Sequence, residues 1–227
     1  MSVRGTPFIV GEYYHLYNRG ILKNNIFLNN HDKDRLLKLL FICNGSNPVV
    51  FRDVQELPLA EIERGNPLVD IGAYCFMPNH FHILARERVQ GGISAFMEKM
   101  ATGYVMYFNK KHERTGRLFE GTFKSRHIDD EAYLHWLFTY IHLNPVKLIE
   151  SKWKETGIHN PTKARNYLND YKYSSYADYF LGKRNEELIL NKSVFPEAFR
   201  DMDDFKILIN EWRGGRDQEE FAKGNPM

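Results

Sequence analysis

The sequence has little cysteine, little net charge and no long apolar run. Its two cysteines, Cys43 and Cys75, are too few for a disulfide framework and form no Cys-x-x-Cys pair, which excludes the disulfide-stapled secreted scaffolds and fits a reducing cytosol. A run of about 18 apolar residues, as a membrane span requires, is missing, and so is the apolar segment of a signal peptide. The formal net charge of +2 excludes proteins whose bulk charge alone indicates a polyanionic partner. We therefore expect a cytoplasmic protein that does not enter a membrane.

The sequence does contain ample material for a packed core. Of its 227 residues, 43% are hydrophobic and 14% aromatic, which suits one domain with embellishments. We expect a domain over residues 1–150, with an insertion at about 44–68, and a C-terminal helical extension over 151–227 whose last residues are disordered. Basic charge gathers within residues 110–126, where six Lys or Arg residues accompany two acids. Either a solvated basic loop or a phosphate-binding surface explains this excess.

The spacing of apolar residues predicts an α+β domain. Alternation indicates strands, and repeats of three and four residues indicate helices. In chain order we expect a strand at 12–20, a helix at 30–43, strands at 69–77 and 80–87, a helix at 91–116, a strand at 117–128 and a helix from 131 to the proline at 145. The order β-α-β-β-α-β is that of the ferredoxin-like split βαβ fold, an antiparallel sheet with helices on one face. The last helix is an addition to that fold.

Local signals predict where these elements turn or end. Asn30 or Asp32 is expected to cap the first helix, and a Pro-Asn pair joins the two central strands as a hairpin. The added helix follows the capping residue Asp129 or Asp130. It is expected to end at Pro145, because a residue before proline is pushed out of the helical region. The insertion at 44–68 is expected to hold one short helical or extended piece.

The segment "MPNHFHILA" (77–85) places two histidines one residue apart on a predicted strand. Side chains alternate across a strand, so His80, His82 and Leu84 share one face, and Phe81, with its odd-numbered neighbours, takes the other. Two adjacent imidazoles can hold a divalent metal, or they can be a chance pair on a wet face of the sheet. A third ligand and a reacting group are needed to choose between these readings.

The added helix offers both a third ligand and a reacting group. In "FTYIHLNPVK" (138–147), Tyr140 and Asn144 are four residues apart and share a helical face. An amide oxygen with two imidazoles suits Mg²⁺ or Mn²⁺ and leaves coordination positions for phosphate oxygens. A phenol near such a metal can attack phosphorus, because the metal offsets its charge. On spacing alone the alternative stays open that Tyr140, one of thirteen tyrosines, is a core or surface residue.

Five segments in order resemble the single-tyrosine HUH endonucleases, specifically the REP-associated tyrosine transposase branch of bacterial transposases. They are "YHLYNRG", "CFMPNHFHIL", "RLFEGTFKSRHID", "YIHLNPVK" and "YKYSSY", and they extend from about residue 14 to 176. The resemblance implies metal ligands at His80, His82 and Asn144 and a nucleophile at Tyr140. Related transposases often have Gln where this chain has Asn144. The insertion at 44–68 and the residues beyond 176 lie outside the resemblance.

The function that this resemblance implies is a transposase and single-stranded DNA endonuclease. It would cleave and rejoin single-stranded or hairpin DNA through a 5′-phosphotyrosine, with Mg²⁺ or Mn²⁺, as a monomer or homodimer. Arg19, Lys124 and Arg126 are candidate phosphate contacts, although an exposed basic residue needs no such role. The alternatives are a non-catalytic or host-adapted DNA-binding regulator on the same fold, and a metallohydrolase. The metallohydrolase lacks a carboxylate beside the histidine strand.

Three further aromatic or imidazole side chains have ordinary interpretations. His15 in the first strand and His142 in the added helix are expected to be packed or surface residues, since His142 lies about 200° around the helix from Tyr140. Trp136 could stack on a base, but a tryptophan in a helix is more often part of the core. None of the three is predicted to be a ligand.

Overall fold

The four strands of the computed structural model form one antiparallel sheet in the order β2-β3-β1-β4. The structure describes residues 7–197 and 205–214, so the predicted disorder of the last residues falls outside the described part. The strands are β1 Tyr13–Arg19, β2 Val69–Met77, β3 His80–Glu87 and β4 Lys124–Ile128. Strands β2 and β3 form a hairpin, as predicted, and β1 lies between β3 and β4. The sheet order and the order of elements along the chain confirm the predicted ferredoxin-like α+β fold.

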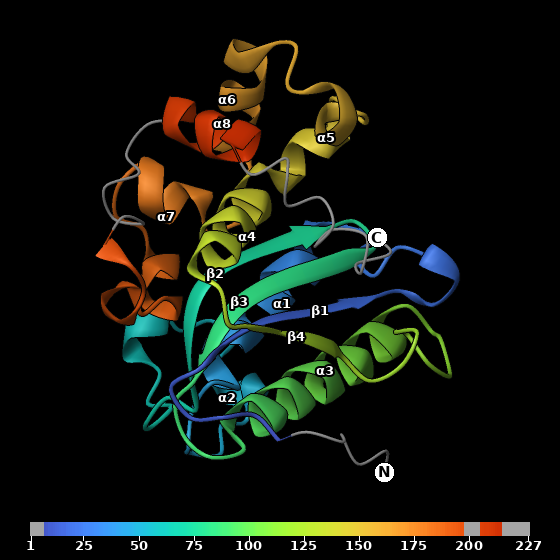
Figure 1. The fold of residues 1–227 in the computed structure, drawn as a ribbon. Coiled ribbons are helices and arrows are strands. Elements are labelled where there is room, and N and C mark those ends of the chain that lie inside the picture. The colour runs from blue at the N-terminus through green and yellow to red at the C-terminus, as the bar shows by residue number, and fades with distance from the viewer. Residues whose placement is uncertain (1–6, 198–204, 215–227) are drawn as a thin grey trace.

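Helices cover both faces of this sheet (Figure 1). Helices α1 Asn30–Ile42 and α3 Gly92–Lys111 pack on one face, against side chains such as Leu16, Phe81 and Ile83. Helix α4 Glu131–Leu143 packs on the other, against Ala73, Cys75 and Leu84. Side chains that face α1 and α3 alternate along the strands with side chains that face α4, as the pleat of a sheet requires. The added helix therefore lies on the face that also carries the histidine pair.

Three predicted boundaries were wrong. Asn29 caps α1: its side chain accepts from the Asp32 backbone, while the Asp32 carboxylate accepts in return from Asn29. Helix α3 ends at Lys111 rather than 116, because the chain leaves the helix through Glu113, which has a φ of 51°. Strand β4 begins at Lys124 rather than 117. Residues 117–123 pass the end of β1, where Phe119 makes a single bridge to Gly20.

The remaining elements are short. They are η1 Ile21–Lys23, α2 Phe51–Val54, η2 Leu59–Glu61, η3 Asn144–Leu148, α5 Trp153–Thr156, α6 Pro161–Asp170, α7 Tyr176–Phe180, η4 Asn185–Ile189, η5 Lys192–Val194 and α8 Phe205–Gly214. The insertion at 44–68 thus holds two short helices instead of one short piece. In the described ranges, helices are too short or too polar to cross a membrane.

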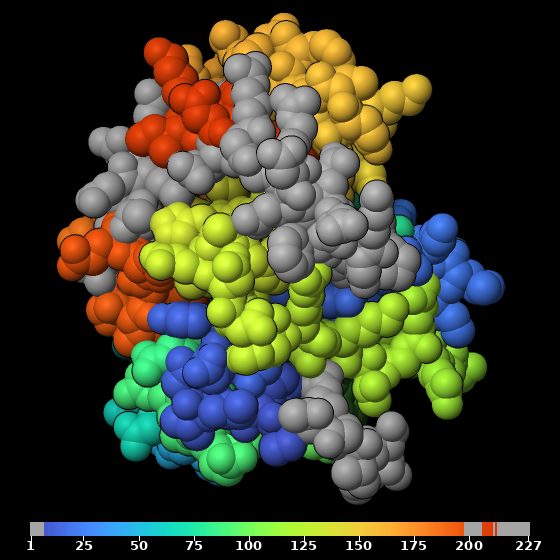
Figure 2. Space-filling model, viewed as in Figure 1, coloured from blue at the N-terminus to red at the C-terminus, as the bar shows by residue number. Residues whose placement is uncertain are grey.

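The C-terminal segments pack on α4 and on the edge of β2. Residues 171–176 run along β2: the Phe76 amide donates to the Tyr173 carbonyl, and the Ser175 amide donates to the Tyr74 carbonyl, each at 2.9 Å. In space-filling view the yellow-green surface of α4 lies between the C-terminal segments and the blue N-terminal strand region (Figure 2). The "YKYSSY" motif therefore joins the extension to the sheet.

Candidate active site

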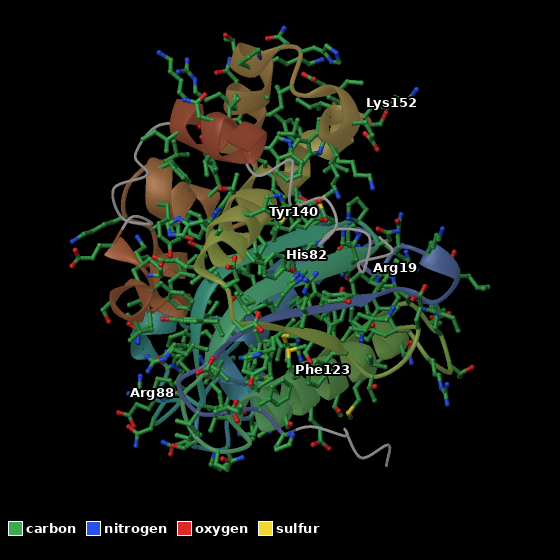
Figure 3. The ribbon with its side chains drawn as sticks, in the orientation of Figure 1. Arg19, His82, Arg88, Phe123, Tyr140 and Lys152 are labelled. Atoms are coloured by element: carbon green, nitrogen blue, oxygen red, sulfur yellow. The ribbon has the colours of Figure 1, made fainter. Side chains whose placement is uncertain are left out.

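The histidine pair of β3 faces the tyrosine of α4. His80 and His82 lie on the same side of the strand, with ring centroids 5.0 Å apart and planes at 85°. The ring of Tyr140 stands edge-on to His82, with centroids 5.3 Å apart and planes at 77°. Figure 3 shows Tyr140 and His82 close together between α4 and the sheet. The structure thus brings together two of the elements that the sequence predicted to form a site.

Both imidazoles are held in the neutral form that binds metals. Burial lowers the pKa of His80 to about 3, and the charges of Lys147, Lys154 and Arg19 act in the same direction. Burial likewise lowers the pKa of His82 well below its usual value. His80 Nδ1 is 2.6 Å from the Asn79 side-chain oxygen, so this nitrogen donates and Nε2 keeps its lone pair. A neutral imidazole with a lone pair on Nε2 is a metal ligand.

His82 has a histidine partner behind it. Its Nδ1 lies 2.8 Å from Nε2 of His15, and both side chains are fully buried. His82 Nε2 is also buried, and it has no hydrogen-bond partner. A buried polar atom without a partner requires an explanation, such as a bound ion. His82 Nε2 is the ring nitrogen that does not face His15, so it is the one that would bind a ligand.

Tyr140 is buried among aromatic rings and one cation. Its hydroxyl accepts a hydrogen bond from Lys154 Nζ at 2.9 Å, and that ammonium lies 4.4 Å from the ring centroid. The ring stacks on Trp136, with centroids 5.2 Å apart. Burial raises the pKa of Tyr140 to about 12, and the Asn144 amide and the Lys147 charge oppose this rise. Burial lowers the pKa of Lys154 to about 8. Trp136 belongs to the core, as expected.

Asn144 lies one turn beyond Tyr140, in a conformation that the sequence did not predict. Although it precedes Pro145, its φ and ψ are −53° and −40°, so the expectation that proline displaces it from the helical region was wrong. Pro145 has no N–H to continue the α-helical hydrogen bonds, and the chain tightens into the 3₁₀ turn η3 instead. Both polar atoms of the Asn144 amide are buried and make no hydrogen bond of regular geometry, although the amide is close enough to the Tyr140 hydroxyl to lower its pKa.

The residues present fit a hard divalent cation. His82 Nε2 and the Asn144 oxygen are buried without hydrogen-bond partners, and His80, whose ring centroid is 5.0 Å from that of His82, has an Nε2 lone pair. The described residues contain no cluster of three or more His, Cys, Asp or Glu side chains suited to a metal, so within that part of the chain the ligands of a cation here are neutral. Neutral ligands leave its charge available to phosphate oxygens, which suits Mg²⁺ or Mn²⁺ with substrate bound.

The three residues predicted to contact phosphate differ in their position and in their partners. Arg126 and Lys124 pair in register with His15 and Tyr17 of β1, so they lie on the sheet face of the histidines. Arg19 acts on His80 electrostatically but is bound to the Glu120 carboxylate at 3.0 and 3.3 Å. The Arg19 guanidinium is therefore paired with a carboxylate, whereas the Lys124 side chain is exposed.

Sequence reasoning missed two cations and one histidine. The charges of Lys147 and Lys154 both lower the pKa values of His80 and His82. Lys147 stands in the "LNPVK" segment, whereas no local pattern indicates Lys154. His15 is packed, as expected, but its contact with His82 was not foreseen. His15 pairs in register with Leu84, which shares a face of β3 with His80 and His82; alternation along the first strand was a signal for this face, but the register could not be predicted.

His142 is a structural residue, in agreement with its interpretation. It is fully buried, with Nδ1 2.9 Å from the Phe138 carbonyl and Nε2 2.7 Å from Ser175 Oγ. Both nitrogens are thus hydrogen-bonded within the core. This contact links α4 to the "YKYSSY" segment, and it places His142 away from the pair on β3.

Comparisons with known proteins agree with the resemblance seen in the sequence. Residues 59–144 match the family described as "Transposase IS200 like". No curated protein matches the chain. The similar solved structures include "Structure of the REP associates tyrosine transposase bound to a REP hairpin", which is 14% identical with a TM-score of 0.48, covering 79% of this chain and 85% of that one. The segment that matches the transposase family contains His80, His82, Tyr140 and Asn144.

Proposed function

We propose that this protein cleaves and rejoins single-stranded or hairpin DNA, with Tyr140 as the nucleophile. The observation that carries the proposal is the juxtaposition of three groups from separate elements. The Tyr140 ring lies 5.3 Å from that of His82, whose Nε2 is bare and buried. Lys154 donates a hydrogen bond to the phenol oxygen. A phenol beside a cation and a bare imidazole nitrogen has what a phosphotyrosine reaction needs.

The reaction can be written with these side chains. The Tyr140 oxygen attacks phosphorus in line, the bond from phosphorus to the 3′ oxygen breaks, and the 3′ oxygen takes up a proton. The phenol proton leaves to solvent, and Lys154 stabilises the phenolate as it forms. Mg²⁺ or Mn²⁺, held by His80, His82 and Asn144, would polarise the phosphate that is attacked.

The product is a 5′-phosphotyrosine on the downstream fragment and a free 3′-OH on the upstream one. Attack of a 3′-OH on the phosphotyrosine reverses the step and rejoins DNA without ATP, because the covalent bond keeps the energy of the broken one. Lys124 and Arg126 lie on the sheet face of the histidines and would contact the DNA backbone. Such contacts position a strand without reading its sequence.

The test is formation of a covalent adduct. Labelled single-stranded or hairpin DNA incubated with the protein and Mn²⁺ should give a species that survives SDS and heat. Tyr140→Phe keeps the ring packed and removes only the attacking oxygen, so folding and DNA binding should persist while the adduct disappears. Replacing both His80 and His82 by Ala should also abolish the adduct.

A matched control is available on the same face. Tyr17 lies with its ring 6.3 Å from that of His82, and Tyr17→Phe should leave the adduct intact. An adduct that persists in Tyr140→Phe would refute the assignment of the nucleophile. Binding of DNA without any adduct in the unmodified protein would instead identify a regulator, and release of two unattached fragments would identify a metallohydrolase.

A further inference from the structure

The contact between His15 and His82 has a geometry that a metal ligand requires. The two rings are nearly parallel, with centroids 5.0 Å apart and planes at 24°, and the facing nitrogens are 2.8 Å apart. Both side chains are fully buried. His15 pairs with Leu84 in the β1–β3 register, so it reaches His82 diagonally across the sheet. Two rigid strands therefore fix the two rings relative to each other.

We propose that His15 is a positioning residue that holds His82 in the tautomer with a bare Nε2, ready to bind the divalent metal. This inference rests on the proposed function, since it assigns a role within the same site. One of the two facing nitrogens must carry the shared hydrogen. When His82 Nδ1 donates to His15 Nε2, the lone pair of His82 Nε2 points away from His15, toward the site.

The charges around the pair favour this arrangement on the His82 side. Lys147 and Lys154 both act on His82, and a nearby cation favours a bare nitrogen over one that carries a hydrogen. Arg126 acts in the same way on His15, which favours a bare nitrogen there as well. Arg126, however, also lies over the Tyr133 ring at 4.3 Å. A metal on His82 Nε2 requires the ring hydrogen on Nδ1, where it is shared with His15 Nε2 at 2.8 Å.

A neutral histidine in this role differs from the more usual carboxylate partner. A carboxylate behind a ligating histidine raises its basicity and adds negative charge to the site. His15 adds none, and both His80 and Asn144 are neutral too. The site is thus built to orient its ligands without neutralising the cation. Binding of the metal should therefore be weak in the free protein and strong when a phosphate enters.

The experiment compares two substitutions at one position. His15→Gln can place its side-chain oxygen near the position of His15 Nε2 and still accept from His82, whereas His15→Leu offers no acceptor. Titration with Mn²⁺, followed by the electron paramagnetic resonance of the free ion, should show a Kd about 10–100-fold higher for His15→Leu. For His15→Gln it should stay close to that of the unmodified protein.

The matched control is another fully buried histidine. His142→Leu removes a hydrogen-bonded imidazole that lies away from the pair, so it should lower stability without changing the Mn²⁺ affinity. Equal Kd values for His15→Leu and the unmodified protein would overturn the proposal. So would a His15→Gln variant that folds and binds Mn²⁺ as poorly as His15→Leu.

A second readout needs no variant and no DNA. The ¹⁵N chemical shifts of the imidazoles, measured with Zn²⁺ as a diamagnetic probe, identify which nitrogen of His82 carries hydrogen. Hydrogen on Nδ1 supports the proposal, and hydrogen on Nε2 refutes it. Because neither measurement uses cleavage, the role of His15 can fail while adduct formation succeeds, and the reverse can also occur.

Discussion

Replacing Lys154 by Met should slow adduct formation and change its dependence on pH. The ammonium donates to the Tyr140 oxygen at 2.9 Å, and a methionine keeps much of the stem while removing the donor. A hydrogen bond to a charged group is worth about 1.5–3 kcal/mol. A tenfold change in an equilibrium corresponds to about 1.4 kcal/mol, so loss of this bond raises the pKa of the Tyr140 phenol. The phenolate fraction near neutral pH then falls about 10–100-fold.

The direction of the pH effect follows from the pKa values of Tyr140 and Lys154. The pKa of Tyr140 is about 12, so its phenolate fraction rises with pH throughout the working range in both proteins. The pKa of Lys154 is about 8, so the unmodified protein has the ammonium below this pH and loses it above. The advantage of the unmodified protein over Lys154→Met should therefore be largest below pH 8 and should shrink as the pH rises beyond it.

The assay is single-turnover adduct formation on hairpin DNA from about pH 6.5 to 9.5. Lys152→Met is the matched control, since Lys152 is exposed and points away from the site (Figure 3). It should leave the rates unchanged. A Lys154→Met protein that reacts as fast as the unmodified one, or a rate ratio that stays constant across the pH range, would refute this role for the ammonium.

Two other predictions concern the support of α4 and the DNA surface. Ser175→Ala leaves the α4 imidazole and the Tyr74 amide without a buried partner, so urea unfolding should show a loss of about 1–3 kcal/mol; an unchanged midpoint would contradict this. Glu120→Gln removes the ion pair between Glu120 and Arg19, and because exposed pairs are worth ~0.2–1 kcal/mol, affinity for single-stranded DNA should rise up to about fivefold in fluorescence anisotropy. Unchanged affinity at low salt would show that Arg19 does not reach the DNA.

The main features of the site could be predicted because they depend on local periodicity. Alternation placed His80 and His82 on one face of a strand, and a four-residue spacing placed Tyr140 and Asn144 on one face of a helix. Both relations are fixed by backbone geometry within a single element. The order of the strands then followed from the order of the elements.

Other features depend on contacts between elements and left no local pattern. Lys154 reaches Tyr140 from a separate short helix, and His15 reaches His82 across strands. The alternation in residues 117–123 resembled a strand, but these residues lie beyond the end of β1 and cannot continue its ladder. At Asn144 the general effect of a following proline was outweighed, because a 3₁₀ turn accommodates Pro145 without displacing the residue before it.

The pairing of residues 171–176 with β2 has a consequence for the order in which the chain can fold. Strand β2 lies at the edge of the sheet. Its outer amide and carbonyl groups bond to segments made about a hundred residues later, as in the pair Tyr74 and Ser175 and in the bond from the Asn191 amide to the Ile71 carbonyl. During synthesis the β2–β3 hairpin therefore has an unpaired edge until these later segments are made. An unpaired edge can form hydrogen bonds with strands of other copies of the chain. A fragment ending at residue 150 would keep that edge permanently, so we expect it to aggregate. We therefore expect the smallest autonomous folding unit to extend past the "YKYSSY" segment.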